Sequence, residues 1–80
     1  MLETNCDSEL IIFCKNIIFL RKKHGYSKKR MAAILEISLY SLNKIERLDY
    51  PPFLKVTVIL NIWDHFEILP KDQFIPLYSD

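Results

Sequence analysis

Two short apolar segments, each preceded by a serine, constrain the fold of this chain more than any other feature. They fill residues 27–47, which read SKKRMAAILEISLYSLNKIER. Ser27 and Ser38 stand where helix N-caps are expected, and Ile37 falls between the segments. Apolar residues recur within each segment at the spacing of one helix face. The stretch therefore predicts two short helices joined by a tight turn, with core residues Met31, Ala32 and Leu35 in the first and Leu42 and Ile45 in the second.

The composition favours an all-α fold with a single domain. The chain has 80 residues, half of them apolar, with one glycine and four prolines. Hairpins need glycine-containing turns, and alternating apolar and polar runs are absent, so a β-rich fold is not expected. A chain of this length forms one small core and needs most of its apolar residues to do so. We predict one domain over residues 1–80, a compact five-helix bundle with the paired short helices at about residues 27–47.

Caps and breakers give the expected boundaries of the other elements. Residues 1–7 are polar and are expected to form a flexible lead-in, with Asp7 or Ser8 capping the first helix. Gly25 is expected to end that helix. Proline cannot continue a helix, so residues 48–52 should form a loop. The remaining prediction is a fourth helix over about residues 53–65 and a short last helix that begins at Pro70 and ends before Pro76.

Charge is distributed unevenly along the chain. The total is +1, but residues 15–47 hold nine Lys or Arg and two Glu, a net charge of +7. The ends, residues 1–14 and 48–80, carry −3 each. A basic middle between acidic ends predicts one basic face, which is typical of proteins that bind nucleic acid. The alternative is an ordinary solvated helix surface.

The sequence holds no set of residues typical of an active site. Cys6 and Cys14 form neither a CxxC pair nor a disulfide framework, and no metal-ligand spacing links them to histidines. His24 and His65 lie far apart in the sequence and are expected at helix ends or on the surface. There is no glycine-rich phosphate loop and no apolar run long enough for a membrane span. We therefore expect a cytoplasmic binding module that is not an enzyme and uses no cofactor, metal or small-molecule substrate.

Motifs spread over residues 20–52 match one known family without a gap in spacing. They are Leu20-Arg21, Gly25-Tyr26-Ser27, Met31-Ala32, Ile37-Ser38, Ile45-Glu46-Arg47 and Pro52. This pattern resembles the lambda-repressor-like helix-turn-helix family, also called the XRE family. The later run at residues 62–66, IWDHF, followed by Pro70 and Phe74, looks like the tail helices of that family. Two departures stand out, because the family often has glycine where this chain has Glu36 and Leu48.

The resemblance implies roles for individual residues. Residues on the second short helix match positions that face DNA bases, and basic residues at the helix starts and ends match positions that hold phosphates. One further pair matches a buried ion pair that joins the first helix to the second short helix. The expected base-contacting residues are Leu39, Tyr40, Ser41 and Lys44, the expected phosphate-contacting residues are Lys28, Lys29 and Arg47, and the structural ion pair is Arg21 with Glu46.

The sequence thus predicts a small transcriptional regulator of bacterial or phage type that binds double-stranded DNA as a homodimer. The alternative is a protein-binding module on the same scaffold, such as an antitoxin-like partner, because Leu39 and Tyr40 are unusually apolar for base readers. Two groups of apolar residues exceed what the core needs, and either could form the dimer interface. The first is Ile11, Ile18 and Phe19 in the first helix. The second, which we favour, lies towards the C-terminus and is Trp63, Phe74, Ile75, Leu77 and Tyr78. The alternative for Trp63 and Phe74 is that they complete the core of one monomer.

Overall fold

The computed structural model describes residues 2–49 and 55–78, and the regular secondary structure in these ranges is entirely helical. The all-α prediction is confirmed for this part of the chain, although the predicted fifth helix is a short 3₁₀ helix. The elements in chain order are α1 (Leu2–Lys23), α2 (Lys28–Leu35), α3 (Leu39–Glu46), α4 (Val56–Phe66) and the 3₁₀ helix η1 (Pro70–Phe74).

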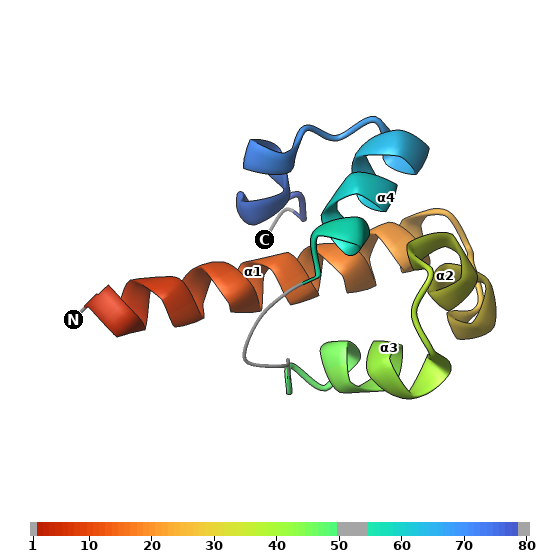
Figure 1. Cartoon of the computed structure of the whole chain (residues 1–80), viewed down its shortest axis with the longest axis horizontal. Coiled ribbons are helices and arrows are strands. Elements are labelled where there is room, and N and C mark those ends of the chain that lie inside the picture. Colours follow the sequence, from red (N-terminus) through yellow and green to blue (C-terminus); the bar gives the residue numbers. More distant parts are fainter. Residues whose placement is uncertain (1, 50–54, 79–80) are drawn as a thin grey trace.

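Helix α1 is the longest helix, and α3 and η1 pack directly against it (Figure 1). In this view α3 lies on one side of α1, while α4 and η1 lie on the other side. Helix α2 packs against both α3 and α4, and η1 packs against both α1 and α4. The molecule measures 36 × 24 × 24 Å, with the long dimension along α1. The core therefore lies between α1 and the helices on its two sides.

Apolar residues from all four α-helices form one core. The core-facing residues predicted for α2 and α3 are buried, as are Phe13, Ile17 and Leu20 from α1. Cys14 also packs there as a small apolar residue, and burial raises the pKa of its thiol to about 11. That thiol stays protonated at neutral pH and is a poor nucleophile. The buried apolar set is Phe13, Cys14, Ile17, Leu20, Met31, Ala32, Leu35, Leu42, Ile45, Val58 and Ile62.

The predicted start of the first helix, after a cap at Asp7 or Ser8, is wrong, because α1 begins at Leu2. No proline or glycine occurs before Gly25, so nothing in the backbone stops the helix from extending to the N-terminus. In Figure 1 the first turns of α1 project beyond the other elements.

The C-terminal segment folds back onto α1 of its own chain. Pro70 occupies the first turn of η1, and only five residues separate it from Pro76. So short a segment suits a 3₁₀ helix. The Phe74 ring stacks on Phe13 with centroids 4.9 Å apart, and Leu77 packs against the core. These two side chains therefore complete the monomer. The predicted start of the fourth helix at residue 53 lies outside the described residues; α4 is described from Val56.

A buried asparagine holds this segment in place. The amide of Asn16 donates to the carbonyl oxygens of Gln73 (2.8 Å) and Ile75 (3.0 Å), and its oxygen accepts from the Leu77 N–H (2.9 Å). Gln73 is also buried, and its amide donates to the carbonyl oxygens of Ile59 and Ile68. The Asn16 bonds satisfy the Ile75 carbonyl and the Leu77 N–H, which lie after the end of η1.

Replacement of Asn16 by Ala should lower the free energy of unfolding by about 2 kcal/mol, because three backbone groups lose their partner but can reach water if the tail detaches. Native-state hydrogen exchange should show that the Leu77 amide loses its protection. Asn61→Ala is the matched control, since Asn61 donates to the Leu35 carbonyl, at 3.0 Å, and not to the C-terminal segment described here. If Leu77 stays as protected in Asn16→Ala as in the parent, Asn16 does not hold the tail.

Candidate nucleic-acid interface

Serine caps set the starts of α2 and α3. The Ser27 hydroxyl accepts from the Arg30 N–H at 3.1 Å, and the Ser38 hydroxyl accepts from the Ser41 N–H at 3.0 Å. Both serines have extended backbone angles, as N-cap residues do. The sequence prediction of two capped helices separated by a short turn is therefore confirmed.

Helices α1, α2 and α3 all end in the same way. In each, one residue with positive φ follows the helix: Gly25 (φ 69°), Glu36 (φ 60°) and Leu48 (φ 61°). The next N–H reaches back five residues, as in Tyr26 to Arg21 (2.9 Å), Ile37 to Ala32 (3.0 Å) and Asp49 to Lys44 (2.8 Å). This is the Schellman arrangement, which usually uses glycine at the left-handed position.

Glu36 and Leu48, where the resembled family often has glycine, therefore adopt the backbone that glycine favours. Each costs about 1 kcal/mol relative to glycine. The core between α2 and α3 offsets that cost, so the turn keeps its geometry without glycine.

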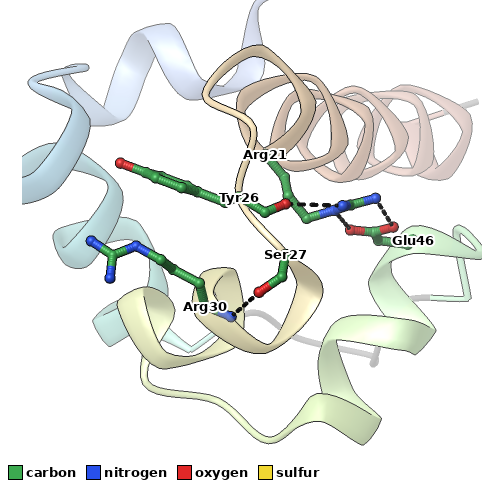
Figure 2. A network of polar contacts seen from close by, with 5 residues as sticks. All are labelled: Arg21, Tyr26, Ser27, Arg30 and Glu46. Atoms are coloured by element: carbon green, nitrogen blue, oxygen red, sulfur yellow. Dashed lines mark hydrogen bonds and ion pairs between the residues drawn. The ribbon is translucent and has the colours of Figure 1, made fainter.

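An ion pair fixes α3 to the end of α1. Arg21 Nε donates to Glu46 Oε2 at 2.6 Å, and Nη2 donates to Oε1 at 3.2 Å, so the contact is bidentate (Figure 2). Arg21 Nη1 also donates to the Tyr26 carbonyl oxygen at 3.2 Å. The two charged side chains are only 16% and 10% exposed. One guanidinium thus joins α1, the loop before α2 and the last turn of α3.

With Leu42 and Ile45 buried, the opposite face of α3 is open to solvent. Tyr40 is 69% exposed and Leu39 is 47% exposed. Ser41 and Arg47 are exposed, and Lys44 is partly exposed. All five residues that the resemblance places against DNA on α3 are therefore accessible.

Contacts within α3 orient three of these side chains. The Lys44 ammonium lies 5.6 Å from the centroid of the Tyr40 ring, one helical turn away. The Ser38 hydroxyl, which accepts from the Ser41 N–H, donates its own proton to the Ser41 hydroxyl oxygen at 3.0 Å. The Ser41 hydroxyl proton is then free to donate outward.

The basic residues of α2 differ in where they lie. Lys28 and Lys29 are exposed in its first turn. Lys29 lines a shallow hollow with Ser27, Arg30, Ala33 and Ile34 on the outer face of α2. The Arg30 guanidinium stacks on the Tyr26 ring, 5.2 Å from its centroid. In Figure 2 it points away from Glu46 and α3. The predicted phosphate contacts include Lys28 and Lys29 but not Arg30.

An aromatic cluster between the end of α1 and the end of α4 was not predicted. The Tyr26 hydroxyl lies 3.1 Å from His65 Nε2, and the Tyr26 ring stacks on His24 with centroids 5.5 Å apart. Phe66 contacts both histidines. Both histidines are exposed near helix ends, but the sequence held no sign that these residues, 41 positions apart, share Tyr26 and Phe66 as neighbours, since that depends on the packing of α4.

No group of three or more His, Cys, Asp or Glu side chains among the described residues is arranged to hold a metal ion. No helix described is long and apolar enough to cross a membrane.

Comparisons with known proteins give no family assignment. No family model matches the chain, no curated protein is significantly similar to it, and no solved structure matches it.

Proposed function

We propose that this chain is a helix-turn-helix protein that binds double-stranded DNA with α3 in the major groove, as a small transcriptional regulator of bacterial or phage type. The observation that carries the proposal is the exposed face of α3, on a helix that a serine cap and the Arg21–Glu46 ion pair hold rigidly. An α-helix with its side chains is about 10–12 Å across, which suits the width of the major groove, and the eight residues of α3 give it about two turns. A homodimer on a two-fold operator is the expected form, because one domain makes few contacts.

The chemistry of α3 favours particular base edges. Lys44 is a hydrogen-bond donor, and the contact with Ser38 leaves Ser41 a donor as well. Guanine presents two acceptors, N7 and O6, in the major groove, so two neighbouring donors favour guanine. Leu39 is suited to pack on a thymine methyl group. We therefore expect an operator half-site that contains guanine and thymine.

Phosphate contacts would supply most of the affinity and make it depend on salt. Lys28→Ala and Arg47→Ala should each weaken binding to all duplexes, and each should reduce the slope of log K against log salt by about one. Fluorescence anisotropy with a labelled random-sequence duplex measures this slope.

Lys71→Ala is the control, because Lys71 is exposed in η1, on the other side of α1 from α3 (Figure 1). Its slope should equal that of the parent. An unchanged slope in both Lys28→Ala and Arg47→Ala would mean that neither residue contacts phosphate.

A protein-binding module on the same scaffold is the second candidate, and the exposure of Leu39 and Tyr40 favours it. A protein that docks on these apolar side chains would bind with little dependence on salt, whereas DNA binding weakens steeply as salt rises. If the same anisotropy series shows no binding to duplex at low salt, that result would favour this second function.

A further inference from the structure

The outer face of α4 carries a stripe of exposed apolar side chains, Val56, Leu60 and Trp63. They are 66%, 47% and 44% exposed, whereas Val58 and Ile62 on the opposite face are buried. Their spacing of four and then three residues puts them in one row along the helix. No described element covers this row, and none of its residues belongs to α3.

Charged residues stand at both ends of this stripe, with opposite signs. Lys55 immediately precedes α4, Asp64 lies in its last turn and Glu67 follows it, and all three are exposed. Leu60, Trp63 and Asp64 also line a hollow on this face. The surface is therefore basic at one end, apolar in the middle and acidic at the other end.

We infer that the outer face of α4 binds the same face of a second copy of this chain, with the two helices antiparallel about a two-fold axis. An antiparallel arrangement places Lys55 of each copy beside Asp64 and Glu67 of the other, and buries both apolar stripes. A parallel arrangement would place like charges together. The surface is thus complementary to itself in one orientation only, which selects a second copy as the occupant.

The size of the surface sets the strength of the association. Stable complexes bury about 800 Å² per partner, and three apolar side chains on an 11-residue helix offer less than that. The dimer should therefore dissociate in the micromolar range or above. It differs from the predicted tail interface, in which Phe74 and Leu77 pack on their own core whereas Trp63 and Ile75 are exposed. The inference does not depend on DNA binding.

Two charge variants test the orientation. Lys55→Glu makes both ends of the stripe acidic, and Asp64→Lys with Glu67→Lys makes both ends basic. Each change puts acid at the N-terminus or base at the C-terminus of α4, which the helix dipole favours, so the helix should keep its fold. Sedimentation equilibrium of the full chain up to about 1 mM gives the dissociation constants.

The parent should dimerise, and each variant alone should dimerise at least about tenfold more weakly. An equimolar mixture of the two should associate as tightly as the parent, because each acidic end then meets a basic one. Lys71→Glu, which changes the net charge outside the stripe, should behave like the parent.

Three results would each overturn the inference: a parent that is monomeric at 1 mM, variants that dimerise as the parent does, or a mixture that stays monomeric. Equal weakening by Lys71→Glu would also overturn it, because net charge would then explain the effect. None of these outcomes bears on DNA binding, which the salt series measures separately.

Discussion

Replacement of Arg21 by Ala should lower the free energy of unfolding by about 3 kcal/mol. The change leaves the Glu46 carboxylate, only 10% exposed, without the two N–H groups that now bind it. Removing one partner of a largely buried ion pair is costly because the other charge stays desolvated. The Tyr26 carbonyl oxygen also loses a donor. Thermal unfolding followed by circular dichroism should show a drop of about 12 °C or more for a chain of this size.

Two further variants separate the ion pair from general effects of charge. Lys22→Ala removes the same charge from the neighbouring exposed position and should change the stability by less than about 0.5 kcal/mol. Arg21→Lys keeps the charge but cannot form the bidentate contact, so it should fall between Arg21→Ala and the parent. A melting temperature of Arg21→Ala equal to that of the parent would show that the pair does not stabilise the fold.

Local signals in the sequence predicted the central part of the fold correctly. Ser27, Ser38 and Gly25 act within one helical turn, so their roles as caps can be inferred without knowledge of the rest of the chain. The apolar spacing of α2 and α3 likewise identified their buried faces. The same reasoning failed for the start of the first helix, expected at Asp7 or Ser8, because nothing in the polar segment before these residues opposes a helix.

Contacts between distant residues were the part that the sequence did not reveal. Asn16 bonds to residues 57 to 61 positions away, and this explains both the place of the tail and the burial of Leu77. One signal was available, since Asn16 follows Phe13 by three residues and precedes Leu20 by four, on the core stripe of α1. Its partners are backbone groups, which no side-chain pattern specifies.

In the candidate site, too, the features set by local spacing were predictable and those set by distant contacts were not. The exposure of Leu39, Tyr40 and Ser41 follows from the burial of the opposite face of α3, so it was predictable from the helical period. The contact of Lys44 with Tyr40 follows from their spacing of four residues. The separation of Arg30 from α3 was not predictable, because it depends on the position of the Tyr26 ring.

Combined replacement of Tyr40 and Lys44 by Ala should abolish the preference for a selected operator while leaving the fold intact. Tyr40 is the most exposed of the large apolar residues on α3, and Lys44 contributes the cation that lies over its ring. Each good contact to a base edge is worth about 1–3 kcal/mol of discrimination, so loss of both should reduce the preference by about 30-fold or more. The core residues Leu42 and Ile45 are untouched, and the melting temperature should stay near that of the parent.

The matched control replaces an exposed apolar residue and a lysine on the other side of α1 from α3 (Figure 1), namely Leu69→Ala with Lys71→Ala. This pair should leave the operator preference unchanged.

Selection from a pool of random duplexes, followed by sequencing of the bound fraction, tests the central claim most directly. The proposal predicts that the parent and the Leu69/Lys71 control enrich one common sequence with guanine and thymine in each half-site. It predicts that Tyr40→Ala with Lys44→Ala enriches no sequence. Enrichment of the same sequence by this double variant, or of none by the parent, would contradict the claim that α3 reads DNA bases.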